Sequence, residues 1–314
     1  MTVGLSSIAL ERAAPGASMG SGMARSKEAV AAQDEARIAA NEAGGDAGTI
    51  ARRGSLEVRI AQTPEEIDAA QALRYRVFYE EMSATPDAKA LATRRDADRF
   101  DEFCDHLLVV DHALADEDAG EGVQAKAVVG CYRLLRQEVA DQHGGFYTAG
   151  EYDIEPLLDR ARNEGLRFLE LGRSCVLEGY RNKRSVELLW HGIGYYLAMH
   201  NLDVMFGCAS FETTDPDALA LPLSYLYHEF LTPDEWYVRA LGDQYVEMNR
   251  IPKDEINLRD ALRALPPMIK GYIRAGCYIG DGAVVDEQFG TTDVLILFPV
   301  SRINDRYFSK FGKA

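Results

Sequence analysis

The sequence predicts an α/β or α+β domain built on a mixed sheet. Strand-like segments come in hairpin-like pairs early in the chain, and a strand–helix–strand unit follows in its middle. The chain has 314 residues, of which 47% are hydrophobic, so it can bury a sizeable core. No stretch approaches the ~20 apolar residues of a membrane helix. We expect no secretory signal, because the apolar run over residues 3–10 is short.

The first 54 residues differ from the rest of the chain in composition. They are rich in Ala, Gly and Ser, contain no aromatic residue, and carry equal numbers of basic and acidic side chains. Such a segment has little to bury, so we expect residues 1–54 to form a disordered N-terminal extension. We expect residues 55–314 to form the domain, which then carries the whole net charge of −16.

The net charge and the cysteines exclude several classes of function. A surface with a net charge of −16 repels nucleic acid, so DNA or RNA binding is not expected. The five cysteines are Cys104, Cys131, Cys175, Cys208 and Cys277. They form no CxxC pair, which favours reduced thiols in a cytoplasmic protein over disulfides or a zinc site.

Hydrophobic spacing predicts the strands and helices of the domain. The predicted strands lie over 56–61, 106–111, 125–135, 166–177, 204–209 and 293–300. The predicted helices are one that begins after 63, one over 184–201, one over 217–230 that is broken at Pro222, and one over 265–275. The predicted connections are a loop over 83–106, an acidic loop over 116–122, and a segment with a short helix over 150–164. The first strand alternates apolar and polar residues, and the helix over 184–201 has apolar residues at helical spacing. Thr63 and Pro64, followed by two glutamates, have the order of a helix start.

One strand–turn–helix segment, residues 169–192, carries a pattern with a chemical meaning. Its strand reads Leu-Glu-Leu-Gly-Arg-Ser-Cys-Val, and a Tyr-Arg-Asn-Lys-Arg turn leads into the helix. The helix N-terminus suits a phosphate, and Arg181, Lys183 and Arg184 add positive charge there. This segment resembles the core of the GCN5-related acetyltransferase (GNAT) fold. The resemblance implies a mixed, mostly antiparallel central sheet flanked by helices.

The phosphate-binding turn departs from the GNAT pattern. That family has Gln/Arg-x-x-Gly-x-Gly/Ala, but here Arg181 is followed by Arg184 and Val186 where the small residues belong. Without glycine the backbone cannot close tightly around a pyrophosphate, which disfavours coenzyme A. A 4'-phosphopantetheine arm on acyl carrier protein has a single phosphodiester, and Arg181, Lys183 and Arg184 could also meet the acidic carrier. The alternative is that these are solvated turn charges. We expect the protein itself to hold no cofactor and no metal.

Four spaced blocks resemble the acyl-homoserine-lactone synthases. They are residues 73–78, 98–101, 129–135 and 169–173. Those enzymes share the GNAT fold and take acyl groups from acyl carrier protein. Their pattern is Arg-x-x-Val-Phe, Asp-x-x-Asp, Gly-x-x-Arg-Leu and Glu-Leu-Ser-Arg, and this chain has Gly172 in place of the serine.

Further stretches match another group of N-acyltransferases. They are residues 170–176, 186–190, 207–211, 214–216, 265–286 and 291–294. They resemble the ornithine acyl-carrier-protein N-acyltransferases, and the resemblance covers residues 56–312. The homoserine-lactone synthases lack the C-terminal stretches, so these favour the ornithine family. The resemblance implies transfer of a 3-hydroxy fatty acyl group from acyl carrier protein to the α-amine of L-ornithine, which gives lyso-ornithine lipid.

The candidate site follows from these blocks. Aminolysis of a thioester needs a base for the ammonium proton, and Glu170 lies mid-strand on the face opposite Leu169 and Leu171. The alternative for Glu170 is a structural ion pair with Arg173 or Arg133. We name Glu170 and Arg173 as candidate catalytic residues. The candidate substrate-binding residues are Arg74, Phe78, Asp98, Asp101, Arg133, Ser174, Cys175 and Val176.

The charged members of this set have alternative interpretations. Asp98 and Asp101 either bind the cationic amino acid or belong to a solvated acidic loop. Arg74 and Arg133 stand among apolar residues, which indicates partner carboxylates. They either hold the aspartates or bind the carboxylate of the substrate.

Two further roles are needed for this chemistry. A tetrahedral oxyanion needs a donor, and the resemblance to the GNAT fold implies a backbone N–H of the central strand, here that of Cys175 or Val176. The same resemblance implies Tyr225 or Tyr227 as the acid that protonates the leaving thiolate.

Two other chemistries are disfavoured. Direct transfer needs no acyl-enzyme, which argues against Cys175 as a nucleophile with His191 or His200. Residues 104–106 offer cysteine, aspartate and histidine but no distant partner motif for a metal.

The apolar stretch over 265–274 has three interpretations. It lines the acyl tunnel, touches the membrane peripherally, or is an ordinary packed helix. Two alternatives to the main function also stay open. One is an N-acyl amino acid or homoserine-lactone-type synthase that uses another amine, and the other is a non-catalytic module that binds carrier protein or lipid.

Overall fold

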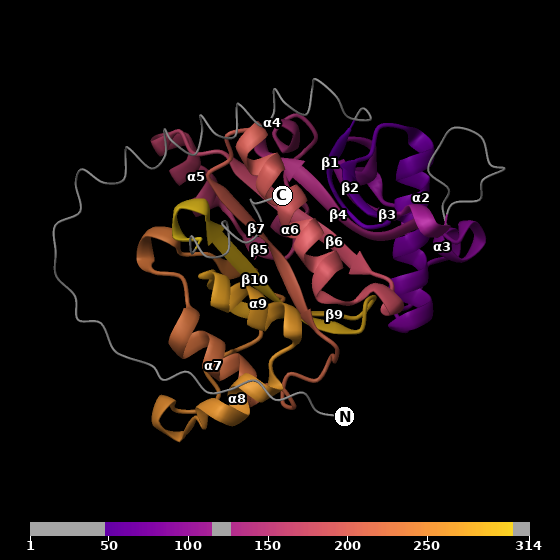
Figure 1. Cartoon of the computed structure of the whole chain (residues 1–314). Helices are drawn as coiled ribbons and strands as arrows, with labels where there is room; N and C mark the ends of the chain where they lie inside the picture. Colours follow the sequence, from indigo (N-terminus) through magenta and orange to yellow (C-terminus); the bar gives the residue numbers. More distant parts are fainter. Residues whose placement is uncertain (1–47, 115–126, 304–314) are drawn as a thin grey trace. The chain divides into compact units, whose positions relative to one another are not determined.

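The computed structural model describes residues 48–114 and 127–303 of the chain, and a ten-stranded sheet is the centre of this part (Figure 1). The strands are β1 (Thr49–Arg53), β2 (Leu56–Ile60), β3 (Asp105–Asp111), β4 (Val128–Arg136), β5 (Tyr152–Asp153), β6 (Phe168–Val176), β7 (Val204–Phe211), β8 (Arg239–Ala240), β9 (Tyr278–Asp286) and β10 (Thr291–Pro299). Their order in the sheet is β1-β2-β3-β4-β6-β7-β10-β9-β8-β5.

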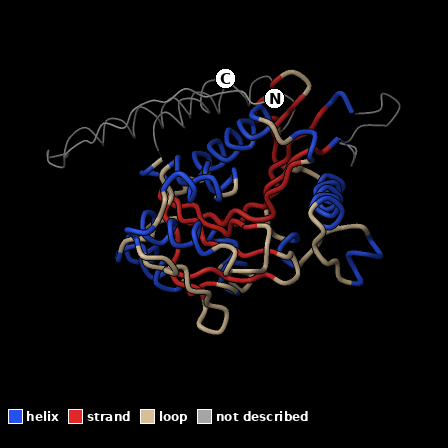
Figure 2. The backbone as a smooth tube through the Cα atoms, turned by 90° about the horizontal axis from the view of Figure 1, so that it is seen from below, coloured by secondary structure: helices blue, strands red, loops and turns tan. Residues whose placement is uncertain are grey.

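Helices lie on both faces of this sheet (Figure 2). The α-helices are α2 (Pro64–Tyr75), α3 (Ala88–Thr93), α4 (Gln137–Ala140), α5 (Glu155–Glu164), α6 (Lys183–Met199), α7 (Ala220–Phe230), α8 (Leu258–Ala264) and α9 (Pro267–Ala275). A π-helix, η1 (Arg76–Glu81), continues α2, and the short 3-10 helices include η2 (Arg99–Glu102), η5 (Tyr147–Gly150) and η8 (Lys253–Glu255). No helix of the described residues is both long enough and apolar enough to span a bilayer.

The sheet is mixed and mostly antiparallel. Only the β6–β7 and β8–β9 pairs are parallel, and the other neighbours run antiparallel. The predicted fold class, a mixed and mostly antiparallel central sheet flanked by helices, is therefore confirmed.

Alternating side chains of β10 divide the core into two layers. Val294, Ile296 and Phe298 belong to a large cluster that includes residues of α6, α7 and α9. Leu295 and Leu297 belong to a smaller cluster with α5 and with aromatic residues of β6 and β7. Because successive strand residues point to opposite faces, these two clusters lie on opposite sides of the central strands.

Most of the predicted elements are present. β2, β3, β4, β6, β7 and β10 lie where strands were expected, and α6 and α9 lie where helices were expected. Helix α2 begins at Pro64, and the Thr63 side chain accepts a hydrogen bond from the Glu66 backbone N–H, as a capping residue does.

Three predictions were wrong in part. Residues 49–53 of the predicted disordered extension form β1, because a turn at Gly54 folds them onto β2. The predicted loop over 83–106 contains α3 and η2. Pro222 does not break the helix over 217–230, because α7 begins only at Ala220 and a first-turn proline removes no intrahelical hydrogen bond.

Besides β1, three strands were not predicted: the two-residue strands β5 and β8, and the long strand β9. β9 carries Gly280 and Gly282, which interrupt the apolar alternation that identifies a strand. The rest of the N-terminal extension, residues 1–47, and the acidic loop predicted over 116–122 lie outside the described residues.

Candidate active site

The two central parallel strands pair over only three residues before they part. Phe168, Leu169 and Glu170 of β6 pair with Val204, Met205 and Phe206 of β7, and no pair follows although both strands continue. At the point of parting, a Cβ atom on Gly207 would lie 2.2 Å from the Leu171 carbonyl oxygen. The close backbone approach therefore requires glycine there. Beyond it a gap opens in the sheet.

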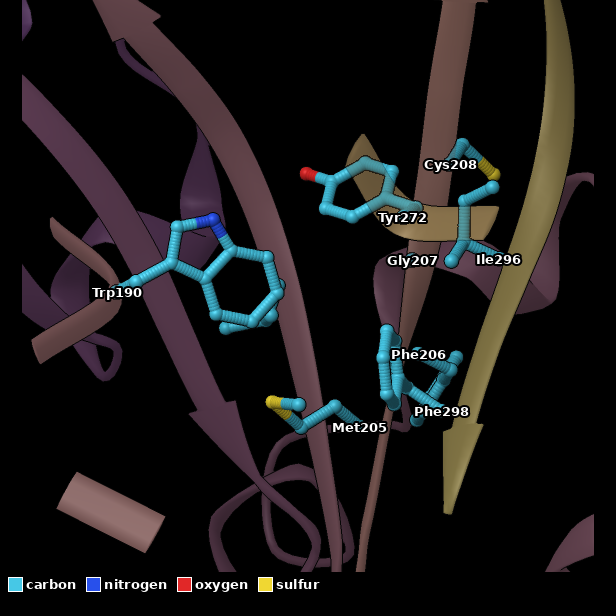
Figure 3. A pocket seen from close by; sticks show the side chains of 9 residues that line it. Trp190, Met205, Phe206, Gly207, Cys208, Tyr272, Ile296 and Phe298 are labelled. Carbon is cyan, nitrogen blue, oxygen red and sulfur yellow. The ribbon is translucent and has the colours of Figure 1, made fainter. Parts of the chain in front are cut away.

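An apolar cavity lies beside this gap. Its lining residues are Leu171, Trp190, Met205, Phe206, Gly207, Cys208, Tyr272, Ile296 and Phe298. Figure 3 shows Trp190 of α6 and Tyr272 of α9 beside each other at the cavity, and their rings make an edge contact with centroids 6.0 Å apart. The predicted stretch over 265–274 thus contributes Tyr272 to the cavity. A lining of this kind suits an acyl chain.

Strand β6 carries a bulge where it borders the gap. Gly172 pairs with Arg133 and Cys175 pairs with Cys131, so two residues, Arg173 and Ser174, face one residue of β4. Arg173 has a φ of 49°, in the left-handed region that non-glycine residues seldom adopt. The bulge therefore directs the Arg173 side chain in a way that a regular strand would not.

The register of β6 distinguishes between the two predicted oxyanion donors. The Leu177 backbone N–H donates to the Val129 carbonyl at 3.0 Å, towards β4. Because backbone N–H groups alternate between the two edges of a strand, the Cys175 N–H also points to β4 and the Val176 N–H points to the open edge. The Val176 carbonyl accepts a hydrogen bond from Arg181 Nε at 3.0 Å. Val176, and not Cys175, thus offers a backbone donor to the gap.

Three predicted arginines hold the predicted aspartate box. Arg74 is fully buried and binds both Asp101 carboxylate oxygens at 2.7 Å, with Asp96 at 2.8 Å. Burial opposes the charge of Asp101, but the hydrogen bonds from Arg74 keep its pKa well below the usual range. The alternative of a solvated acidic loop is therefore wrong for Asp101, which is buried.

Asp98 connects two other members of this network. Arg133 Nη1 lies 2.6 Å from Asp98 Oδ1, and Arg173 Nη2 lies 3.0 Å from Asp98 Oδ2. The Arg173 guanidinium also lies 4.9 Å from the ring centre of Tyr147 and 5.1 Å from that of Phe289. Phe289 in turn packs edge-on against Phe78 at 5.5 Å between centroids. The structure thus brings the upstream blocks and β6 together.

Glu170 lies next to the gap but is engaged by backbone. Its carboxylate oxygens accept hydrogen bonds from the backbone N–H groups of Tyr147 at 3.0 Å and Thr148 at 2.7 Å. Its structural partners are therefore backbone groups of η5 and not the arginines that the alternative interpretation named. Burial raises the pKa of Glu170 in spite of these hydrogen bonds.

Sequence patterns did not identify a second group of carboxylates near the gap. One carboxylate oxygen from each of Glu151, Asp286 and Asp293 lies within 4.8 Å of the others. Burial raises the pKa of Glu151 to about 7 and that of Asp293 to about 6. The three residues come from separate segments, so no local motif could have indicated them. Such a group could hold a cation.

The structure also places the other candidates. Cys175 Sγ lies 3.6 Å from Cys131 Sγ, and His200 Nδ1 lies 3.4 Å from an Arg136 nitrogen, so the predicted alternative of a Cys175–His200 pair is not formed. His106 Nε2 faces the Asp101 backbone carbonyl.

Neither Tyr225 nor Tyr227 lines the cavity. Instead the cavity residue Tyr272 bonds through its hydroxyl to the Tyr132 hydroxyl at 3.0 Å. Burial raises the Tyr272 pKa well above its ordinary value, so this phenol keeps its proton.

The basic turn leads into α6 as predicted. Asn182 caps the helix by accepting hydrogen bonds from the Arg184 and Ser185 backbone N–H groups. Arg181 pairs with Glu81 at 2.5 Å, whereas Lys183 is 86% exposed. Arg184 is exposed as well. Basic side chains are therefore presented to solvent close to Val176.

A family model and several curated proteins are similar to this chain. The family described as "Acetyltransferase (GNAT) domain" matches residues 73–191. The "L-ornithine N(alpha)-acyltransferase" of Brucella abortus is 51% identical over 278 residues, which are 88% of this chain and 96% of the relative. The protein of the same name from Agrobacterium fabrum is 52% identical over 84% of this chain and 88% of the relative.

Among solved structures, the N-acyl amino acid synthase FeeM from uncultured soil microbes has a TM-score of 0.42 and 13% identity, over 81% of this chain and 94% of that one. The acyl-homoserine-lactone synthase LasI has a TM-score of 0.41 and 12% identity, over 83% of this chain and 98% of that one. The identity to the curated relatives, over nearly the whole described chain, settles the family: this chain belongs to the L-ornithine N(alpha)-acyltransferases, with a GNAT domain at its core.

Proposed function

We propose that this protein transfers a 3-hydroxy fatty acyl group from acyl carrier protein to the α-amine of L-ornithine, and so makes lyso-ornithine lipid. The observation that carries the proposal is the 51–52% identity to three relatives named L-ornithine N(alpha)-acyltransferase. The parting of β6 and β7, with an apolar cavity on one side and carboxylates nearby, is consistent with it.

The gap between β6 and β7 suits aminolysis of a thioester. In this proposal the acyl chain occupies the cavity, and the thioester carbonyl lies against the Val176 N–H, which stabilises the tetrahedral oxyanion. The new C–N bond forms as the C–S bond breaks. The ammonium loses one proton to a base before attack, and the nitrogen of the adduct loses a second as the amide forms. The thiolate of phosphopantetheine gains one proton from its donor, which regains one from the adduct nitrogen. Tyr272, hydrogen-bonded to Tyr132, is the proposed proton donor.

Glu170 is the proposed base, acting through a water molecule. Its raised pKa favours proton uptake, but both oxygens already accept backbone N–H groups, so a bridging water fits better than direct contact. The pH–rate profile of a Glu170 variant distinguishes a base from a residue that only positions the substrate. If Glu170 is the base, Glu170→Gln lowers kcat about 100-fold or more and removes the acidic limb of the pH–rate profile. A Glu170→Gln enzyme that keeps the wild-type profile would assign Glu170 a positioning role.

The proposed donor is acyl carrier protein and not coenzyme A. The turn before α6 has Arg184 and Val186 in place of small residues, and its N-terminal N–H groups are partly used by the Asn182 cap. Arg181, Lys183 and Arg184 are placed to meet the phosphodiester of the arm and acidic residues of the carrier. The protein needs no cofactor of its own for this reaction.

The proposed location is the cytoplasm, with peripheral contact at the inner membrane. The product is a lipid, and Met268 of α9 is 41% exposed although α9 also contributes to the cavity wall. Helix α9 also carries Lys270 and Arg274, and a helix surface with basic and exposed apolar residues suits an interface with lipid headgroups.

A direct assay tests the proposed function. Purified protein is mixed with 3-hydroxyacyl carrier protein, or with the matching acyl-CoA, and with a panel of amino acids, and the products are read by mass spectrometry. The proposal expects an amide of L-ornithine from the carrier-bound donor. Acylation only from acyl-CoA, or an amide only with another amine, would contradict it. No amide at all, with carrier binding retained in Glu170→Ala, would favour the non-catalytic module.

A further inference from the structure

We propose that Glu151, Asp286 and Asp293 form the subsite that binds the side-chain ammonium of a diamino acid acceptor. This rests on the proposed function, because it names the part of the site that selects ornithine. It assigns these three residues a role in specificity, separate from the arginine–aspartate network and from Glu170.

The three carboxylates converge although they come from different parts of the fold. Glu151 lies between η5 and β5, Asp286 ends β9, and Asp293 lies near the start of β10. Their oxygens lie within 4.8 Å of one another. Within residues 48–114 and 127–303, no lysine or arginine forms an ion pair with any of them. Three carboxyl groups therefore share one small space without an ion pair to the described part of the protein, and Arg173 acts on Glu151 and Asp293 only from beyond ion-pair distance.

The burial of Asp293 indicates that a ligand is missing from this space. Asp293 is only 8% exposed, yet among the described residues its Oδ1 has no partner in hydrogen-bond geometry and neither has Thr291 Oγ1, although the Ser210 and Thr291 side chains lie close enough to lower the Asp293 pKa. Leaving a buried carboxylate oxygen unpaired is costly, so native proteins seldom do it without a ligand or a functional reason. A bound N–H donor would satisfy both oxygens.

The cluster is connected to the reaction gap. Asp293 pairs in register with Ser210 of β7, two residues beyond Cys208, which lines the cavity. The Cys208 thiol donates to Glu151 Oε2 at 3.1 Å. An acceptor molecule could therefore place its α-amine at the gap while its side chain reaches the carboxylates, as the three methylene groups of ornithine allow.

The available oxygens favour an ammonium over a divalent metal ion. Asp286 Oδ1 already accepts backbone N–H groups of Gln288 and Phe289, and Glu151 Oε2 accepts the Cys208 thiol. Calcium takes six to eight oxygen ligands, more than the free oxygens of this group, and the chelator test below distinguishes magnesium, which keeps several waters as ligands. An ammonium has three donors, one for each carboxylate. The raised pKa values of Glu151 and Asp293 agree with this, because a bound cation would replace the proton that burial favours.

The test compares L-ornithine with L-norvaline, which has the same carbon chain but no side-chain amine. With the same acyl carrier donor, wild-type enzyme should prefer ornithine by about 100-fold or more in kcat/KM. Asp293→Asn should reduce that preference to within about 5-fold, through a higher KM for ornithine. Asp254→Asn, an exposed residue of η8, is the control with the same charge change and should keep the preference.

Several outcomes would overturn the inference. One is an Asp293→Asn enzyme that still prefers ornithine as wild type does. Another is a wild-type enzyme that uses both amines equally, which leaves the acyltransferase function in place. Loss of the preference when a chelator is added to wild type, with recovery on adding magnesium or calcium, would assign the cluster to a metal. If Asp293→Asn fails to fold, Glu151→Gln replaces it in the same comparison. Absence of any ornithine acylation by wild type would instead contradict the proposed function.

Discussion

At the scale of single residues, the site is a set of buried charges that differ in whether they are paired. Arg74 is fully buried and paired with Asp96 and Asp101, so its charge is compensated. Glu151 and Asp293 form no ion pair with a lysine or arginine of the described residues, and burial outweighs the hydrogen bonds from Cys208, Ser210 and Thr291 that lower their pKa values. The first kind of group stabilises the charged state of the site. The second kind of group is available to bind a positively charged group of the substrate.

This difference has a consequence for stability as a function of pH. The pKa of Asp293 is raised to about 6 in the folded protein and that of Glu151 to about 7. The folded state therefore keeps protons that the unfolded chain loses near pH 4, and these two groups lower the free energy of unfolding as the pH rises from about 4 to about 7. Asp101, whose pKa is lowered, acts in the opposite sense.

Asp293→Asn removes one of these titrations and isolates its effect. Relative to wild type, the variant should gain roughly 1–2 kcal/mol of unfolding free energy between pH 4.5 and pH 7.5. Urea unfolding of both proteins at the two pH values measures this difference, in which the contribution of Asp101 cancels. An unfolding free-energy difference that is the same at both pH values would show that Asp293 is not buried as a perturbed carboxyl group.

At the scale of elements, the gap depends on where β6 and β7 stop pairing. Gly207 lets the β7 backbone approach the Leu171 carbonyl just as the strands part. Gly207→Ala places a Cβ atom 2.2 Å from that oxygen, so one strand must shift. We expect a loss of about 1–3 kcal/mol in unfolding free energy and a fall in kcat/KM of about 100-fold, because displaced reacting groups lose much of their rate.

Gly271→Ala is the matched control for this prediction. Gly271 lies inside α9 with open space around the position of a Cβ atom, so alanine should be neutral or stabilising by up to about 1 kcal/mol. Thermal unfolding and steady-state kinetics of both variants provide the comparison. Wild-type kinetics in Gly207→Ala would mean that the parting of the strands does not position the thioester.

Sequence patterns predicted those elements that carry a regular period or a cap. β6 and α6 have clear apolar spacing, and Thr63 and Pro64 identify the start of α2. The same reasoning missed β9, whose glycines hide its alternation. It also named Glu170 from its place in a strand but could not foresee that backbone N–H groups of η5 occupy its oxygens, since that contact joins residues far apart in the chain.

The carboxylate group shows the limit of such reasoning most clearly. Glu151, Asp286 and Asp293 stand in three unremarkable local contexts, and only the order of β10, β9, β8 and β5 in the sheet brings them together. Resemblance to a family indicated the arginines and aspartates of the upstream blocks. It gave no information on the subsite that distinguishes one amine from another.

At the scale of the whole molecule, a net charge of −16 affects how this chain would meet the proposed partner, an acidic carrier protein. Two acidic proteins repel each other at long range, so productive encounter requires a local basic surface. The turn before α6 provides it: Lys183 is almost fully exposed, and Arg184 is exposed next to it. Because screening confines such a field to about 10 Å at 0.1 M salt, the surface acts only on a carrier already near the gap.

Lys183→Glu combined with Arg184→Glu should therefore raise KM for acyl carrier protein by roughly 10-fold at low salt and leave kcat nearly unchanged. The effect should shrink as sodium chloride is added, since salt screens the wild-type attraction and the variant repulsion alike. Arg259→Glu reverses an exposed charge in α8 and should change KM little. An acyl-phosphopantetheine fragment without the carrier separates binding of the phosphodiester arm from binding of the acidic carrier surface. If its KM rises as much as that of the whole carrier, these side chains bind the phosphodiester of the arm and the acidic carrier surface contributes nothing.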